Sequence, residues 1–374
     1  MKQMKNIALG LAALVLAGCV NTIEYDFGKH GAQLMVSGLL YQDEPVHTVY
    51  VSLSQSGTVR AVENAKLVCY VNGTKAAEAS ADRSDLPAPE DYNGFFSKVD
   101  KTLRYRQLPV SFAAPFAPGD EVRLEIEADG GRYKAASARL TVPEPVAVEG
   151  LDTVRVTVRH SDWSEEYLQA RLTLRDRTGG ADWFCLFGRD LGRGFYDFKD
   201  GRPAAACDAA VAMYFYDMDD PVLLDGNMRN SDDLDFLDLT GDGSFAVFSD
   251  RMFRDRTAVV KVNLRPDQIW KLSWELQDVL LRDCGEDCLE ALSTSRIEHR
   301  GELVLGHCNE ETYHYRRALR TISSSDYVPQ IVEPVRIPAN VEGGIGFVDI
   351  VAVSRSSIRF PDIESVHDGI LYTE

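Results

Sequence analysis

The residue of this chain with the most definite chemistry is Cys19. It follows the segment Leu-Ala-Gly at 16–18, in which the small residues Ala17 and Gly18 would let an extended chain enter a peptidase cleft. In such a pattern the cysteine thiol is the group that receives a diacylglycerol. Two lysines precede an apolar run of eleven residues, 7–17, and at about 1.5 Å per residue this run is too short to cross ~30 Å of hydrocarbon as a helix. The pattern predicts a lipoprotein signal peptide over residues 1–18 and lipid on Cys19. The alternative is an ordinary secreted protein with an unrelated cysteine.

The residues after Cys19 bear on where the lipid anchor goes. Val20, rather than an aspartate, follows the cysteine, which favours the outer membrane over retention at the inner membrane. Glu24 and Asp26 form only part of an acidic export pattern, so the periplasmic face and the cell surface both stay open. Two or three acyl chains at about 0.8 kcal/mol per buried CH₂ make such an anchor effectively permanent.

An acidic stretch over residues 232–243 resembles part of a calcium loop. Asp238, Thr240 and Asp242 place oxygens at alternate positions before Gly243, as calcium loops do. The twelfth position is Ser249 instead of a bidentate glutamate. We therefore favour a solvated acidic turn, with a weak Ca²⁺ site at Asp238 and Asp242 as the alternative.

Histidines and cysteines near the C-terminus carry zinc-compatible side chains without zinc-like spacing. The set consists of Cys284, Cys288, His299, His307, Cys308 and His314. No two of them have the spacing of a tight ligand pair, so we expect surface histidines and structural cysteines, and no metal.

Six cysteines remain besides Cys19, and an even number in an exported chain is compatible with disulfides. They stand at positions 69, 185, 207, 284, 288 and 308. Cys284 and Cys288 lie four positions apart, which in a helical turn brings their Cα atoms to about 6 Å, near the upper end of disulfide range. A Cys284–Cys288 bridge and a pair of free thiols are both open.

No catalytic signature is evident. The segment 343–346, Gly-Gly-Ile-Gly, opens a run that reads as a strand, whereas a phosphate-binding loop must open a helix. There is no nucleophile elbow and no zinc-protease motif, and acidic residues are too numerous for any chosen pair to be informative. We predict no catalytic residue and no cofactor.

Composition excludes some partners. The formal charge of −18 becomes −20 for the 356 residues that remain once Lys2 and Lys5 leave with the signal peptide. Such a surface repels phosphate backbones, so nucleic acid is excluded as a partner. A hydrophobic share of 45% argues against global disorder.

Apolar and polar residues alternate with period two along much of the chain, which is typical of half-buried strands. The clearest segments are 47–55, 67–71, 122–127, 154–159, 168–174, 183–187 and 258–264. Asn72-Gly73 is suited to a type I′ hairpin turn. Turn signals every ten or so residues predict a β-sandwich.

These segments predict a mainly β chain with two β domains. After the signal peptide and a tether at 19–30, an immunoglobulin-like β-sandwich is expected over 31–145. A linker at Pro143–Pro145 then leads to a larger β-rich domain over 146–374, since proline restricts itself and its predecessor. One or two short helices are expected within 266–292, and another helix begins at Asn309, a favoured N-cap residue.

The C-terminal third carries a family resemblance. Glu311–Leu319, with its Tyr-x-Tyr core, is followed by Pro334–Phe347, which contains an asparagine and a Gly-Gly-x-Gly-Phe run. With Tyr133-Lys-Ala and Phe248–Phe253, these motifs resemble the domain-of-unknown-function 4249 family of Bacteroidota outer-membrane lipoproteins. Residues 266–295 look like an insertion. The resemblance implies an outer-membrane lipoprotein often found near TonB-dependent transporters, and it supplies no catalytic residues.

We therefore expect a non-catalytic binding or accessory module, anchored through Cys19, that works with an outer-membrane transporter in nutrient uptake. One alternative is a structural component of a surface assembly. Another is a glycan or peptide hydrolase that uses carboxylates among residues 214–250.

Overall fold

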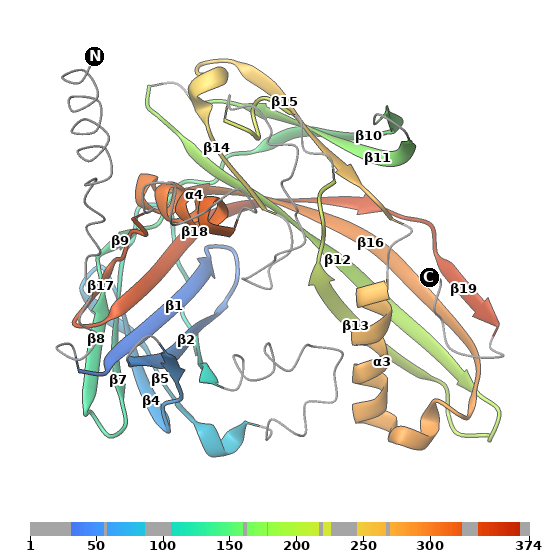
Figure 1. The fold of residues 1–374 in the computed structure, drawn as a ribbon, viewed down its shortest axis with the longest axis horizontal. Helices are drawn as coiled ribbons and strands as arrows, with labels where there is room; N and C mark the ends of the chain where they lie inside the picture. Colours follow the sequence, from blue (N-terminus) through green and yellow to red (C-terminus); the bar gives the residue numbers. More distant parts are fainter. Residues whose placement is uncertain are drawn as a thin grey trace, which may run out of the picture.

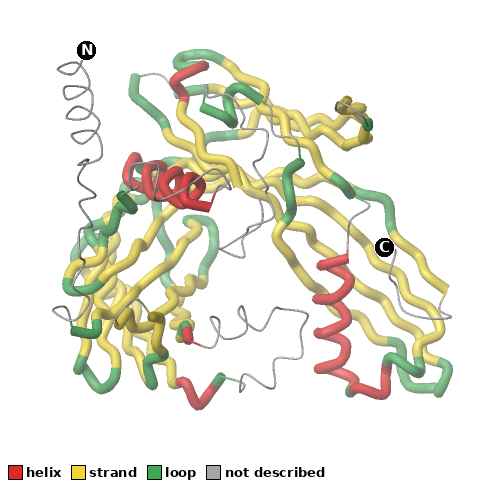
Figure 2. The backbone as a smooth tube through the Cα atoms, in the orientation of Figure 1, coloured by secondary structure: helices red, strands yellow, loops and turns green. Residues whose placement is uncertain are grey.

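The computed structural model describes residues 31–55, 58–86, 106–159, 163–177, 179–216, 220–225, 245–266, 270–323 and 336–366. The described chain is mainly β, as the alternating pattern predicts. Two α-helices and three short 3-10 helices accompany the strands (Figures 1 and 2). No helix in these ranges has the length and apolar character needed to cross a membrane.

The N-terminal part is a sandwich of two sheets around one core. Leu34, Val49, Leu67, Leu124 and Ile126 are all buried in it, because alternate side chains of a strand point to the same face. One layer contains β1 (Gln33–Tyr41), β2 (Val46–Gln55), β3 (Thr58–Arg60) and β6 (Leu108–Ala113). The other contains β4 (Asn64–Val71), β5 (Thr74–Asp82), β7 (Glu121–Ala128), β8 (Tyr133–Ser137), β9 (Leu140–Thr141) and β17 (Val341–Glu342). A 3-10 turn, η1 (Arg83–Asp85), follows β5.

The hairpin predicted at Asn72-Gly73 joins β4 to β5. Both residues have positive φ, 51° and 74°, as a type I′ turn requires. The Asn72 side chain also donates to Asp120 Oδ1 at 2.8 Å and accepts from the backbone N–H of Glu121 at 2.9 Å. Asparagine therefore serves both the turn and its attachment to β7.

Three long strands form the middle of the second part: β12 (Trp183–Phe198), β16 (Leu292–Cys308) and β18 (Ile345–Arg359). Shorter strands flank them: β13 (Ala205–Ala212), β14 (Phe245–Ser249) and β19 (Ile363–Val366). The sheet runs in the order β13-β12-β16-β18-β1-β2-β3, so it continues without a break into one layer of the sandwich.

The junction of the two parts is the parallel pairing of β1 with β18 (blue beside red in Figure 1). Val341, Val348 and Ile350 belong to the same core as the N-terminal strands, and β17 adds to the second layer beside β8. A segment from near the C-terminus thus completes the sandwich expected over residues 31–145. The predicted domain boundary at the proline linker leaves this segment out of the sandwich.

The glycine run at 343–346 makes this junction sterically feasible. Gly346 has φ +115°, and a Cβ added there would lie 2.0 Å from the carbonyl oxygen of Val36. Glycine permits both the positive φ and the close approach. The run opens β18 rather than a helix, which agrees with the rejection of a phosphate-binding loop.

Both faces of the long sheet are covered. On one face lies a three-stranded sheet of β10 (Val148–Arg159), β11 (Ser164–Arg175) and β15 (Thr257–Leu264). Phe184 and Leu186 of β12 belong to the core that it covers, whereas Cys185 and Phe187 belong to a core on the opposite face. Burial on both faces explains why the start of β12 is a continuous apolar run instead of an alternating one.

Two helices pack at different places on the long sheet (Figure 2). Helix α3 (Trp270–Cys284) buries Leu272, Leu276 and Leu280 against the far end of β12 and β13. Helix α4 (Glu310–Ser323) begins directly after Asn309, as predicted, and contacts β12 and β14. The side chain of Asn309 donates to the carbonyl of Thr141 at 3.1 Å. The 3-10 turns η3 (Asp250–Met252) and η4 (Glu286–Cys288) complete this part.

Candidate functional site

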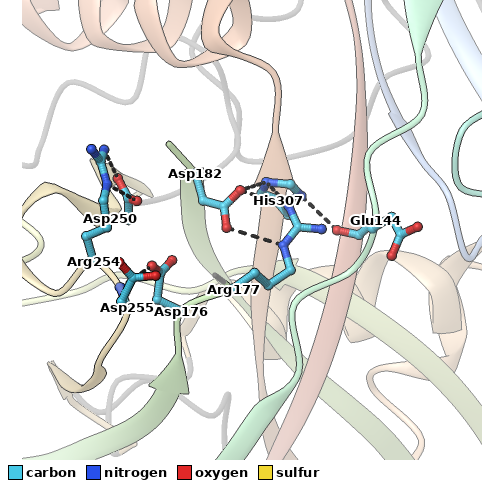
Figure 3. A network of polar contacts seen from close by, with 8 residues as sticks. All are labelled: Glu144, Asp176, Arg177, Asp182, Asp250, Arg254, Asp255 and His307. Atoms are coloured by element: carbon cyan, nitrogen blue, oxygen red, sulfur yellow. Dashed lines mark hydrogen bonds and ion pairs between the residues drawn. The ribbon is translucent and has the colours of Figure 1, made fainter. Parts of the chain in front are cut away.

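A buried polar network of the second part centres on His307, near the end of β16 (Figure 3). Its Nδ1 lies 2.7 Å from the carbonyl oxygen of Glu144, in the proline linker. Its Nε2 lies 3.1 Å from Nη2 of Arg177 and 3.2 Å from Oδ1 of Asp182. Because a carbonyl can only accept, we assign the proton of the neutral ring to Nδ1, which leaves Nε2 to accept from Arg177.

Arg177 and Asp182 form a bidentate ion pair beside the ring. Nη2 of Arg177 is 2.8 Å from Oδ1 of Asp182, and Nε is 3.2 Å from Oδ2, so both carboxylate oxygens are engaged. Burial would raise the pKa of Asp182, but the hydrogen bonds and the charge of Arg177, together with the contact with His307, outweigh it and lower the pKa below its ordinary value. Burial lowers the pKa of His307 most, and the positive charge of Arg177 lowers it further.

This arrangement binds parts of the chain together and leaves the imidazole no free nitrogen. A general base needs an unoccupied nitrogen within reach of a proton to be removed, and His307 is only 6% exposed. Among the described residues, its nitrogens are hydrogen-bonded to Glu144 and Arg177 and lie beside Asp182, with no hydroxyl or thiol among these neighbours. The network therefore fastens the linker to β12 and β16.

Further carboxylates extend the network (Figure 3). Asp250, fully buried, accepts from Arg254 Nε and Nη2 at 2.8 and 2.9 Å, and its backbone N–H donates to the carbonyl of Asp182. Asp176 accepts from the backbone N–H of Asp255 at 2.7 Å through Oδ2. Burial raises the pKa of Asp176, and the neighbouring aspartates raise it further.

Helix α4 holds two more buried aspartates through residue pairs four positions apart, which share one helix face. Thr312 donates to Oδ1 of Asp349 at 2.5 Å, and Nε of Arg316 lies 3.5 Å from Oδ2. Tyr313 and Arg317 form the second pair. The hydroxyl of Tyr313 donates to Oδ2 of Asp225, and the guanidinium of Arg317 donates to the same oxygen at 3.2 Å.

The Tyr-x-Tyr motif thereby acquires a structural explanation. Tyr313 fixes Asp225, whose φ of 51° is unusual for a residue other than glycine. Tyr315 stacks on Phe347 with ring centroids 4.1 Å apart and planes 5° from parallel. The two tyrosines attach α4 to the loop at Asp225 and to the start of β18.

The zinc-compatible residues do not converge. His299 Nε2 lies 3.0 Å from Asp190 Oδ1, and the exposed His314 lies 3.6 Å from Glu310. The described ranges contain no group of three or more histidine, cysteine or acidic side chains able to hold a metal ion. Asp238 and Asp242, the calcium candidates, and Cys19 lie outside the described residues.

The cysteines fall into separate places. Cys284 is the last residue of α3, and Cys288 is buried in η4. Both are free thiols in the structure, which is one of the two alternatives that their spacing left open. A disulfide between them, the other alternative, stays a prediction. Cys185 and Cys308 are buried on adjacent strands.

An open cavity of about 180 Å³ lies where β1 meets the long sheet. Its lining comes from β1, β12, β13, β14 and α4. Three aromatic rings, Tyr41, Phe187 and Phe245, contribute to its walls, and its charged lining residues are Arg189 and Arg316. This cavity could not be predicted from the sequence, because its lining comes from five segments that are far apart in the chain.

Comparison with known proteins identifies one family. Residues 20–357 match the family model described as a domain of unknown function, DUF4249. A search of curated proteins finds no match.

Proposed function

Because the chain belongs to the DUF4249 family, to which no activity is assigned, we propose from its residues that it is a non-catalytic binding or accessory module. It is anchored in the outer membrane by lipid on Cys19 and works with a TonB-dependent transporter in nutrient uptake. The lipid attachment follows from the small residues at 16–18 and the short apolar run before them.

The observation that carries the binding role is the contrast between the polar networks and the cavity. His307, Asp182 and Asp250 are committed to internal hydrogen bonds and ion pairs, so they stabilise the fold. The cavity, in contrast, is open and combines aromatic walls with guanidinium groups, and apolar walls with a few polar groups are the usual composition of ligand sites.

Two other functions have weaker support. A structural role in a surface assembly agrees equally well with a lipid anchor and a β-rich fold. A hydrolase would use carboxylates among residues 214–250; of these, Asp220 accepts backbone N–H groups of Val222 and Lys261, and Asp225 is held by α4. Both aspartates therefore act as structural acceptors.

The transporter partnership is tested by isolating the full-length protein from solubilised membranes and identifying its companions by quantitative mass spectrometry. The matched control is the Cys19→Ser variant, which keeps the folded chain but cannot be lipidated. We expect the wild type in the outer-membrane fraction, with a TonB-dependent transporter enriched over the control. A wild-type protein that fractionates like Cys19→Ser contradicts the anchor, and an anchored protein without an enriched transporter contradicts the partnership.

A further inference from the structure

We propose that the cavity between β1 and the long sheet binds a small aromatic carboxylate. The inference deepens the proposed binding role, on which it rests, by naming a ligand class. It is carried by the size of the cavity, by its aromatic walls and by the sign of the charges that line it.

The size limits the ligand to about one ring. The cavity measures about 180 Å³, and an apolar cavity of about 150 Å³ in another protein accommodates benzene. A six-membered ring with one small substituent therefore fills the space. A nucleotide or a lipid headgroup with its glycerol would leave most of its atoms outside.

The walls suit a flat apolar group. Tyr41 and Phe245 are half-buried, so part of each ring faces solvent, and Phe187 lies behind them with its ring centroid 5.7 Å from that of Tyr41. Val211 adds an aliphatic surface from β13. Aromatic pairs gain stability in offset or edge-to-face arrangements at such separations, which a ring inserted among these side chains can adopt.

The charges select an anion. Both charged residues that line the cavity are arginines, whereas the whole chain carries −18. Arg189 lies over the ring of Tyr41 at 5.1 Å and Arg316 over the ring of Phe245 at 5.8 Å. Each guanidinium is thus beside an aromatic wall, where the carboxylate of a bound aromatic acid would lie.

The ion pair of Arg189 is long and leaves room for a further anion. Its Nη1 is 3.4 Å from Oε1 of Glu44, and the Arg189 side chain is 31% exposed. A guanidinium carries five N–H donors in a planar fork, so a carboxylate joins this contact without displacing it. A cationic ligand would meet two like charges, and a neutral one would forgo the charge-assisted hydrogen bonds.

The test uses the full-length protein and 4-fluorobenzoate as a probe, with 4-fluorobenzamide as its neutral counterpart, followed by fluorine NMR line broadening. Arg189→Gln replaces one guanidinium of β12 with a shorter, neutral amide. Arg193→Gln, on the same strand outside the cavity lining, is the matched control. Ala212→Phe fills the cavity with a ring, and thermal unfolding verifies that each variant is folded.

We expect the wild type and Arg193→Gln to bind the acid equally and the amide about tenfold more weakly. Arg189→Gln should weaken acid binding by about tenfold, the effect of losing a charge-assisted hydrogen bond, and Ala212→Phe should abolish it. Folded wild-type protein that does not broaden the acid, or acid binding that both cavity variants leave intact, overturns the proposal. The companion experiment on the transporter is independent, since it reads co-purification and needs no small ligand.

Discussion

At the scale of single residues, His307 is the side chain at which the linker, Arg177 and Asp182 meet. It accepts from Arg177, lies beside Asp182 and donates to the linker carbonyl of Glu144. Its ring also lies 5.7 Å from that of Phe184. One imidazole therefore joins β12, β16 and the linker, and its removal should loosen all three.

We expect His307→Ala to lower the free energy of unfolding by about 2–4 kcal/mol, because it leaves a cavity and unpaired buried partners. His307→Asn should recover part of this loss, since its amide N–H lies close to the position of Nδ1 and can still donate to Glu144. Urea unfolding measures both. His314→Ala, on the exposed side of α4, is the control and should change stability by less than about 0.5 kcal/mol. A His307→Ala protein as stable as this control would contradict the role of the network.

The same histidine predicts a pH dependence. Burial and, to a smaller extent, the positive charge of Arg177 lower the pKa of His307 below its ordinary value of 6.5. As the pH falls below about 6.5, the unfolded chain takes up a proton that the folded chain still excludes, so the stability present above this pH is progressively lost. Between about pH 7 and about pH 5 the wild type should lose more stability than His307→Asn. Equal slopes in urea unfolding would exclude this origin.

At the scale of elements, β18 is constrained by neighbouring strands on both sides. Its first residues pair with β1 on one side, and residues 352–359 pair with β16 on the other. Gly346 lies where the backbone of β18 approaches Val36 most closely. The strand can enter the sheet only if this position lacks a side chain.

Gly346→Ala should therefore destabilise the protein severely, by about 3 kcal/mol or more, because both the positive φ and the backbone contact become unfavourable. Soluble yield and urea unfolding measure the effect. Gly180→Ala is the matched control, since a Cβ there meets no atom within 4 Å. If the two variants are equally stable, the close approach at Val36 is not a constraint.

Local pattern predicted the elements well where one face of a strand is buried. The alternation at 47–55, the Asn72-Gly73 turn and the helix start after Asn309 all agree with the structure. The pairing of β1 with β18 was not predictable, because alternation determines which face is buried and not which distant strand lies alongside. Arg177 and Asp182 also escaped notice, since 58 acidic residues make any one carboxylate uninformative before its neighbours are known.

At the scale of the whole molecule, the two parts share a sheet and a core. The apolar residues Val341, Val348 and Ile350 complete the interior of the N-terminal sandwich, and β1 has its parallel partner in β18. The N-terminal part is therefore not an independent unit, although its own strands span a continuous stretch of sequence.

A fragment of residues 31–145 should fail to fold as a soluble monomer, because part of its core and one neighbour of β1 are missing. The same fragment with residues 338–353 appended through a flexible linker should fold. Dispersion of amide signals in NMR spectra distinguishes the two outcomes. A well-folded 31–145 fragment would show that β17 and β18 are dispensable for the sandwich.

The pairing of β1 with β18 also determines when folding can finish. Met35 pairs with Ile345, so nearly the whole chain must be available before the first strand gains this partner. Non-local pairing of this kind slows folding and prolongs the exposure of apolar surface. Until then the apolar residues Leu34, Val36 and Leu40 of β1 lack part of their cover. The N-terminal strand therefore waits, during folding, for a partner that lies more than 300 positions further along the chain, and its apolar residues are open to aggregation in that time.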